Sequence, residues 1–136
     1  MVKNRIKGNN SANNDELLYK KLCKLLKEEE LWRNPLINRE ILADIIVTNR
    51  TYLVNAVKKH ANGMTLSEFV NTFRLNNAAR MLSERKRTSI TEIGYESGFN
   101  SRNTFNRQFK QRYGMTPTEF RHQQYAKRVS QRYTDK

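Results

Sequence analysis

The feature that most constrains what this chain can fold into is an internal repeat. The letters GMTLSEF begin at Gly63, and the nearly identical letters GMTPTEF begin at Gly114, 51 positions later. At the same spacing, residues 43–47 align with residues 94–98. Because a repeated sequence usually encodes a repeated structure, we expect two copies of one small unit within the 136 residues.

Capping residues and apolar periodicity divide the chain into about seven helices and predict no strand, so the expected fold class is all-α. The first helix covers residues 15–32, and Asn34-Pro35 should end it. Helices over residues 38–46 and 50–61 follow, with Asn38 as the N-cap of the former. The remaining helices are expected over residues 66–84, 90–97, 101–113 and 117–133. Residues 1–14 are polar, and we expect a disordered tail or a linker there.

Three of these helices begin with a capping box, in which a Ser or Thr lies three residues before a Glu. The pairs are Thr65 with Glu68, Ser89 with Glu92, and Thr116 with Glu119. The N–H groups at the start of a helix attract anions, so these three starts are also candidate phosphate-binding points.

Each copy of the repeat has the layout of a helix-turn-helix: a short helix, a tight break, a longer helix, a glycine and the capped start of the next helix. We expect one such subdomain, with a central linker helix, over residues 15–84 and a second over residues 85–133. The second copy has one extra residue after the break, so Leu53 and Val57 align with Phe105 and Phe109 at a spacing of 52.

Helical geometry separates inward from outward residues on the longer helix of each unit. Phe105 and Phe109 are four residues apart and share one face. At about 100° per residue, Asn103, Arg107 and Lys110 point to the opposite side. The same register turns Leu53 and Val57 inward in the first unit, and it turns Thr51, Asn55 and Lys58 outward.

The charge of the chain favours a polyanionic partner. Lys and Arg number 26 against 13 Asp and Glu, which gives a formal net charge of +13. Arg pairs bidentately with guanine, Asn pairs with adenine, and Lys neutralises phosphate, so the outward residues suit double-stranded DNA. An ordinary solvated face is an equal alternative for either helix alone, but two matched copies in a basic chain favour DNA.

The central helix gives an independent check on the spacing of the two units. Its length of about 19 residues corresponds to ~28 Å at 1.5 Å per residue. One turn of duplex DNA is ~34 Å long. We therefore expect a stiff linker that lets two reading helices enter successive major grooves.

Residues 90–121 read ITEIGYESGFNSRNTFNRQFKQRYGMTPTEFR. This stretch resembles the DNA-binding domain of AraC/XylS-type transcription regulators, because about ten positions occur in the register of that family, among them Gly98-Phe99, Phe105, Arg107, Gly114 and Pro117. The central FVNTFRLNNAARML is similar to the linker helix of the family. The resemblance covers roughly residues 17–121, and it implies a sequence-specific, seven-helix transcription regulator with two helix-turn-helix units in adjacent major grooves.

The resemblance also implies which residues contact bases. The matching positions on the two reading helices are Arg50, Thr51, Asn55, Arg102, Asn103, Thr104, Asn106 and Arg107. Candidate phosphate contacts lie near these helices, at the capped helix starts, and on the linker and last helices. They are Lys58, Lys59, Thr65, Arg74, Arg80, Ser89, Lys110, Thr116 and Arg121.

Two positions depart from the pattern of the family. Val47 stands where the family often has Gly, and a β-branched residue resists a positive φ, so we expect a looser or differently shaped first turn. The first reading helix also has Val54 beside its outward face and no Arg at the Asn55 position. We therefore expect weaker base readout from the first unit than from the second.

Other chemistries find little support in the sequence. Cys23 is the single cysteine, which excludes an intrachain disulfide, and no positioned base accompanies it. His60 and His122 are isolated, and we interpret them as surface groups. No apolar run approaches the ~20 residues of a membrane span, and residues 1–14 lack the apolar stretch of a signal peptide. We expect no enzyme, no cofactor, no metal and no membrane partner, and a cytoplasmic, nucleoid-associated protein.

Two alternatives stay open. One is a basic architectural or RNA-binding protein that does not read bases. The other is the DNA-binding fragment of an alkyl-transfer repair protein, with Cys23 as the acceptor; a membrane-surface helix is a weaker third. Besides DNA, RNA polymerase is a candidate partner. A missing N-terminal sensor or dimerisation domain is another, because members of the family commonly carry one.

Overall fold

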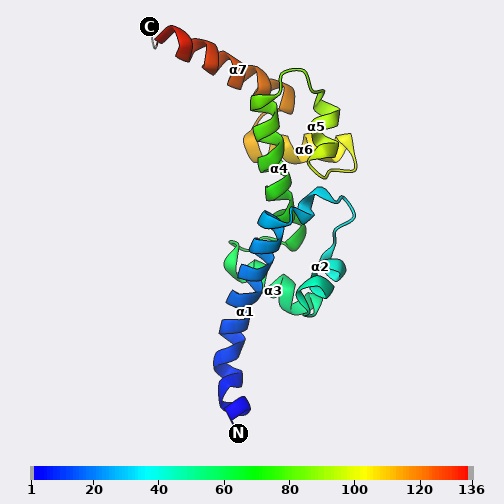
Figure 1. Cartoon of the computed structure of the whole chain (residues 1–136), viewed down its shortest axis with the longest axis vertical. Helices are drawn as coiled ribbons and strands as arrows, with labels where there is room; N and C mark the ends of the chain where they lie inside the picture. The colour runs from blue at the N-terminus through cyan, green and yellow to red at the C-terminus, as the bar shows by residue number, and fades with distance from the viewer. Residues whose placement is uncertain (1, 135–136) are drawn as a thin grey trace. The chain divides into compact units, whose positions relative to one another are not determined.

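The computed structural model describes residues 2–134, with side chains described for residues 14–133. Within this range the chain is all-α, as the sequence predicts. In chain order the elements are α1 (Val2–Glu28), the 3-10 helix η1 (Leu31–Arg33), α2 (Arg39–Ile46), α3 (Arg50–His60), α4 (Leu66–Glu84), α5 (Ile90–Glu96), α6 (Arg102–Tyr113) and α7 (Pro117–Thr134) (Figure 1). No helix within residues 2–134 has the length and apolar character that crossing a membrane requires.

The chain folds as two compact units, Met1–Phe73 and Arg74–Lys136. The division falls inside α4, whereas the sequence places the end of the first unit after residue 84. The reason is that the two halves of α4 serve different cores. Leu66, Phe69 and Val70 belong to the first core, and Leu75, Ala78, Met81 and Leu82 belong to the second. This division also explains why the helix is apolar on more than one face.

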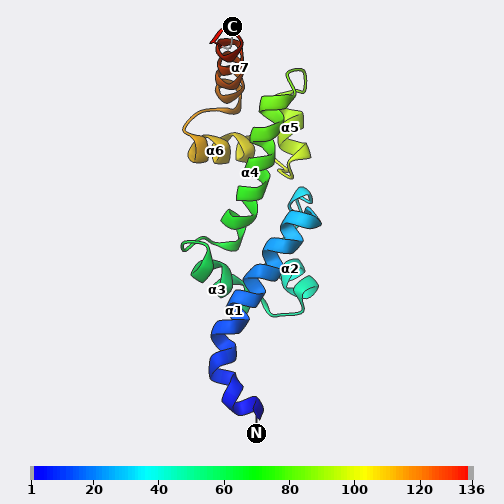
Figure 2. The same ribbon diagram turned by 60° about the vertical axis from the view of Figure 1, so that its left-hand side comes forward.

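In the first unit, α1 packs along α3 and touches α2, so it covers the helix-turn-helix (Figures 1 and 2). The core is built from Leu22 and Leu26 of α1, Leu42 of α2 and Leu53 of α3, all fully buried. Trp32 of η1, the single tryptophan of the chain, adds a large side chain that is only 5% exposed.

In the second unit, the C-terminal half of α4 packs against α5 and α6, which lie beside it in Figure 2. The core is aromatic, with Phe105 and Phe109 of α6 fully buried. The Phe109 ring lies 4.5 Å from the Tyr113 ring and 5.3 Å from the Phe120 ring, measured between centroids. These contacts join α6 to the start of α7.

The helix starts follow the predicted capping. The hydroxyl oxygen of Thr65 accepts from the Glu68 N–H at 3.1 Å, and the Thr65 N–H donates to the Glu68 carboxylate at 3.1 Å. Thr116 and Glu119 repeat this exchange at 3.2 and 2.9 Å. Asn38 and Ser89 cap α2 and α5 by accepting from the Ile41 and Glu92 N–H groups at 2.9 and 3.1 Å.

Both ends of α1 differ from the prediction. The helix begins at Val2, whereas we predicted a disordered tail over residues 1–14 and a start at residue 15. No proline interrupts residues 2–14, and adding residues to an existing helix avoids the cost of nucleation. The helix ends at Glu28 rather than at residue 32. Three carboxylates, from residues 28–30, meet the negative end of the helix dipole there, and Glu30 turns the chain with a φ of 51°.

Candidate nucleic-acid interface

The two helix-turn-helix turns close with the same backbone hydrogen bonds. In the first, the N–H groups of Val47 and Thr48 donate to the carbonyls of Asp44 and Ala43 at 3.2 and 2.9 Å. In the second, 51 residues later, those of Gly98 and Phe99 donate to the carbonyls of Tyr95 and Gly94, each at 3.0 Å. Both are Schellman motifs, so the repeat in the sequence is a repeat in the structure.

Val47 adopts the backbone conformation that this turn requires, even though its side chain is β-branched. Its φ is 63°, in the left-handed region that Gly98 occupies in the second turn with a φ of 98°. The expectation of a looser or differently shaped first turn is therefore wrong. The Val47 side chain is 89% exposed, so it meets little in its surroundings that would oppose this conformation. The left-handed backbone conformation of Val47 itself still costs on the order of 1–2 kcal/mol.

The second helix of each unit presents the predicted faces. Leu53 and Val57 on α3, and Phe105 and Phe109 on α6, are fully buried. Both helices are fixed at their starts, where the Asn49 and Ser101 side chains accept from backbone N–H groups at 2.8 and 3.3 Å. The opposite faces are exposed, with Thr51, Asn55 and Lys58 on α3 and Asn103, Arg107 and Lys110 on α6.

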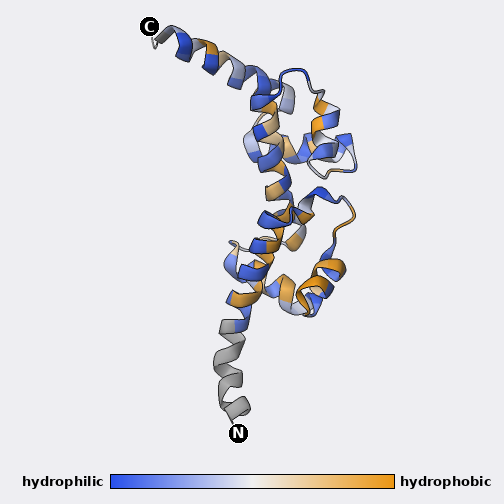
Figure 3. Cartoon of the chain, in the orientation of Figure 1, coloured by the Kyte–Doolittle hydropathy of each residue, from blue (hydrophilic) through white to orange (hydrophobic). Residues whose placement is uncertain are grey.

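Charge is divided between the two helices of each unit in the same way. Neither α3 nor α6 contains an acidic residue, and they carry three and four Lys or Arg residues respectively. The acidic residues lie on the preceding helices, as Glu40 and Asp44 on α2 and Glu92 and Glu96 on α5. α2 is largely apolar along its length, as Figure 3 shows. Each unit therefore offers a basic second helix to an anionic partner.

The eight predicted base-contact residues all lie on α3 or α6, but they differ in exposure and in the contacts that their side chains make. Asn55, Asn103 and Arg107 are exposed, and they make no side-chain hydrogen bond or ion pair with another of the residues that the structure describes. Thr51 and Arg102 are exposed as well, whereas Thr104 and Asn106 are half-buried.

Arg50 is the member of this set that is already paired. Its Nη1 lies 3.2 Å from Oε1 of Glu40 on α2. The pKa of Glu40 is lowered, first by a hydrogen bond from a backbone N–H and then by Arg50. Arg50 would have to leave this exposed pair before it could contact a base.

The predicted phosphate-contact residues fall into exposed and engaged groups. Lys58, Lys59 and Lys110 are exposed beside the outward faces, and Lys59 Nζ lies 3.6 Å from the Asp15 carboxylate. Arg80 donates to Glu84 at 2.8 Å and to Asn77 at 2.9 Å. The remaining position on α4, Arg74, is half-buried, and this burial lowers the pKa of its guanidinium.

Arg121 has a structural role that the sequence did not indicate. Its Nη2 donates to the carbonyl oxygens of Arg85 and Thr88 at 2.8 and 2.6 Å, which fastens the connection before α5 to the start of α7. These bonds span 36 and 33 residues along the chain, so no local pattern could have revealed them.

The three helix starts carry their own anions. The N–H groups of the cap residues Thr65 and Thr116, which precede α4 and α7, already donate to Glu68 and Glu119, as described above. These hydrogen bonds lower the pKa of Glu119, so a carboxylate stands at this positive helix end at neutral pH. Ser89 has its hydroxyl engaged by the Glu92 N–H, and α5 is only seven residues long. A phosphate would compete with these groups.

Within residues 14–133, the remaining titratable side chains do not assemble into a reactive site. Cys23 is half-buried in α1, and burial raises the pKa of its thiol despite a hydrogen bond with Tyr19. His60 is exposed and stacks on the Tyr19 ring at 5.4 Å, and His122 is exposed on α7. Among the described residues, no three His, Cys, Asp or Glu side chains are grouped so that they could hold a metal ion.

Comparison with known proteins identifies the family of this chain. A family model described as a helix-turn-helix domain matches residues 42–123, which run from α2 into α7. The "Probable transcription factor PqrA" of Proteus vulgaris is 37% identical over 94 residues, which cover 69% of this chain and 75% of that protein. The chain belongs to the AraC-type helix-turn-helix family.

The AraC-type assignment agrees with a solved structure. A transcriptional regulator from Chromobacterium violaceum, described as containing an AraC-type DNA-binding domain, is 26% identical. It superposes with a TM-score of 0.59 over 65% of this chain and 77% of that one. AraC-type proteins are DNA-binding transcription regulators.

Some relatives of this chain are far longer than it is. A histidine kinase of Formosa agariphila, "Histidine kinase P4", is 31% identical over 106 residues, which cover 78% of this chain but only 7% of that protein.

Proposed function

We propose that this chain reads a specific DNA sequence by placing α3 and α6 in major grooves. The observation that carries the proposal is the matched pair of helices. Each one buries two core residues at a spacing of four, is capped at its start, and exposes an acid-free basic face on the other side. A single helix of this kind could be an ordinary solvated face, but two in one AraC-type chain favour DNA.

Within this proposal, Asn55, Asn103 and Arg107 read bases first, because their side chains make no hydrogen bond with another side chain among residues 14–133. Arg suits guanine and Asn suits adenine. The flanking contacts come from Thr51, Arg102, Thr104 and Asn106, and from Arg50 once it leaves Glu40. Because α6 offers an arginine where α3 offers Asn55, the second unit should define its part of the DNA site more tightly.

Phosphate contacts set the register of each helix on the duplex. Lys58 and Lys59 on α3 and Lys110 on α6 are exposed and basic, so we assign them this role first. Arg74 and Arg80 on α4, and the capped starts at Thr65, Ser89 and Thr116, come second because they are buried or engaged. Arg121 comes last, since its Nη2 already holds two carbonyls.

The two units should bind half-sites about one helical turn apart. α4 contains 19 residues, which at 1.5 Å each give ~28 Å of helix, and its two halves belong to the two units; one turn of DNA is ~34 Å long. RNA polymerase and a separate sensor or dimerisation domain are further partners in this proposal, as is association with the nucleoid.

Selection of bound sequences from a random DNA pool tests the proposal, followed by titration of the selected site. We expect a defined site bound ~10³-fold or more tightly than random DNA. Arg107→Ala should cost ~1–3 kcal/mol and relax the preference at one base position. Arg128→Ala, which removes an exposed arginine from α7, is the matched control and should preserve the preference.

The alternatives predict different results. An architectural or RNA-binding protein would yield no defined DNA site, and Arg107→Ala would then weaken binding to all sequences equally. An alkyl-transfer repair fragment would transfer an alkyl group to Cys23. The raised pKa of that thiol disfavours the thiolate that such a transfer needs.

A further inference from the structure

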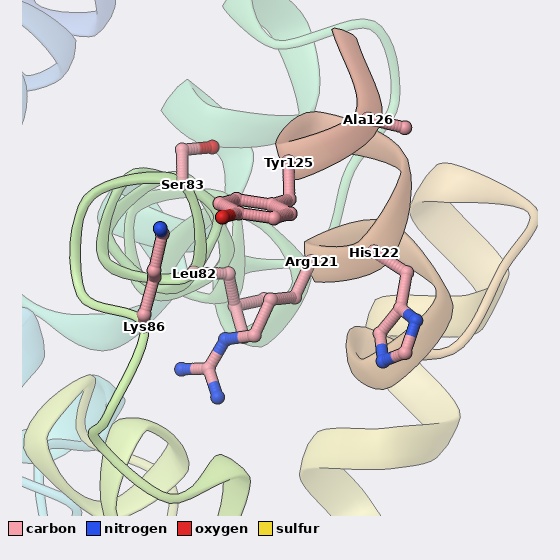
Figure 4. Close-up of a pocket in the computed structure, with 7 residues that line it drawn as sticks. All are labelled: Leu82, Ser83, Lys86, Arg121, His122, Tyr125 and Ala126. Carbon is pink, nitrogen blue, oxygen red and sulfur yellow. The ribbon is translucent and has the colours of Figure 1, made fainter. Parts of the chain in front are cut away.

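The second unit contains a cavity that DNA reading does not use. It has a volume of about 250 Å³, lies between the end of α4 and α7, and is partly open to solvent (Figure 4). Leu82 and Ser83 line it from α4, and Tyr125 and Ala126 line it from α7. The floor is therefore mainly apolar and includes an aromatic ring. None of the described residues that line the cavity comes from α6.

Positive charge surrounds this apolar floor. Lys86 and Arg121 carry this charge, His122 also lines the cavity, and no described lining residue is acidic. The Lys86 ammonium lies 3.9 Å from the centroid of the Tyr125 ring, and Figure 4 shows the two side chains directed toward each other. The pKa of Tyr125 is lowered by its hydrogen bond with Lys86 and by the positive charges of Lys86 and Arg132. The field at this ring favours an anion.

Arg121 adds an unused hydrogen-bond donor. Its Nη2 is engaged by two neutral carbonyls, while its Nε is buried and finds no acceptor among the described residues. Burial lowers the pKa of this guanidinium. A buried donor without an acceptor is costly, and the guanidinium charge, which no carboxylate among the described residues neutralises, would attract an anion in the cavity.

We propose that this cavity binds a small organic anion, an aromatic ring that carries one carboxylate. The ring would lie against Tyr125, Leu82 and Ala126, and the carboxylate would pair with the Lys86 ammonium, near the Arg121 guanidinium. The cavity is smaller than the roughly 300–1,000 Å³ typical of sites for drug-sized ligands, so the ligand has a single ring. Because Arg121 also fastens the connection before α5, the ligand stabilises that connection.

A two-dimensional NMR titration of the whole chain with benzoate tests this site, with benzamide as the neutral probe of the same shape. We expect benzoate to shift the amide signals of residues 82–88 and 121–126, with half-saturation at about 1–10 mM. Benzamide should bind about fivefold more weakly or not at all. Equal affinity for the two probes would overturn the proposal, since the cavity would then be recognising only the ring.

Two variants assign the binding to the cavity. Lys86→Gln should weaken benzoate binding about fivefold, whereas Lys127→Gln, the matched control on α7, should leave it unchanged. Ala126→Phe fills the cavity and should abolish the shifts. Shifts that persist in Ala126→Phe, or that gather on α6, would show general anion binding to a basic surface and would refute the site.

Inorganic phosphate is the remaining probe, because phosphate and carboxylate share the same donors. If phosphate shifts the same signals as strongly as benzoate does, the residues form a phosphate contact and the aromatic specificity is wrong. None of these titrations contains DNA, so the result is independent of whether α3 and α6 read bases.

Discussion

At the scale of single residues, Val47 holds a backbone conformation that suits glycine. Val47→Gly should raise the free energy of unfolding of the first unit by about 1 kcal/mol, because the side chain is 89% exposed and its loss removes little packing. Urea unfolding followed by the fluorescence of Trp32 measures this unit selectively, since that residue is the single tryptophan and lies in the first core.

The opposite substitution, at the matching glycine of the second turn, provides the control. Gly98→Val places the same side chain on the positive φ of the second turn and should destabilise the second unit by at least ~1 kcal/mol, while leaving the Trp32 transition in place. A Val47→Gly chain that unfolds at a lower urea concentration than the parent would show that the turn is not strained.

Gly94 is required for a different reason, which is space. A Cβ at this position would lie 2.7 Å from Cδ2 of Phe105. In the first unit the aligned residues are Ala43 and Leu53, and both are buried. Ala43 is larger than Gly94, and Leu53 is smaller than Phe105. Gly94→Ala should therefore cost ~1–3 kcal/mol through overpacking.

The first unit also suggests the rescue. Combining Gly94→Ala with Phe105→Leu copies the Ala43 and Leu53 pair, so the double variant should lose at least ~0.5 kcal/mol less than the sum of the two single losses. Thermal unfolding followed by circular dichroism gives the three values. Strict additivity would mean that the two positions do not compete for one space.

At the scale of helices, the capping box of α7 makes stability depend on pH. The pKa of Glu119 is lowered by hydrogen bonds from the Thr116 N–H and side chain. A carboxylate with a lowered folded-state pKa stabilises the fold above its usual pKa, near 4.5, and this contribution disappears as pH falls through the folded-state value. Glu119→Gln should therefore flatten the fall in Tm between pH 6 and pH 3.

The comparison for this pH series is Glu16→Gln, which removes an exposed carboxylate of α1 that is paired with Lys20 and takes part in no cap. Its Tm should keep the steeper dependence of the parent chain on pH. If both variants respond alike, the acid sensitivity arises from net charge and not from the cap.

Helix boundaries were predictable wherever local chemistry decides them. α4 occupies the predicted residues 66–84 because Thr65 and Glu68 close its start within four residues of each other. The buried and exposed faces of α3 and α6 could be predicted from the helical repeat of about 100° per residue alone. α1 was mispredicted at both ends, since neither the extension of an existing helix nor the meeting of three carboxylates with the helix dipole is marked by a cap residue or a proline in the sequence.

Contacts distant in sequence were not predictable. Arg121 binds carbonyls more than thirty residues away, and Asn77 donates to Ser97, 20 residues away, in a buried pair. Arg50 and Arg80 looked like free cations, but each is paired with a glutamate. Composition indicates that a basic face exists, but only the folded chain shows which cations remain available to DNA.

At the scale of the whole molecule, the excess of 13 positive charges should dominate the response to salt. If six or more phosphates are neutralised, a plot of log affinity against log salt concentration should have a slope near −5 or steeper. Fluorescence anisotropy with a labelled duplex between 50 and 300 mM salt measures it. A slope close to zero would contradict an interface built on Lys and Arg.

The turns of the two units differ by one residue, and this difference has a practical consequence. The chain reverses at Val47 and Gly98, 51 positions apart, but the caps of the following helices, Asn49 and Ser101, are 52 apart. Asn55 is therefore the counterpart of Arg107 and not of Asn106. Any chimera that transplants the specificity of one unit into the other has to be cut at the longer interval, because a graft made at 51 would rotate every exchanged side chain by about 100° around the helix axis.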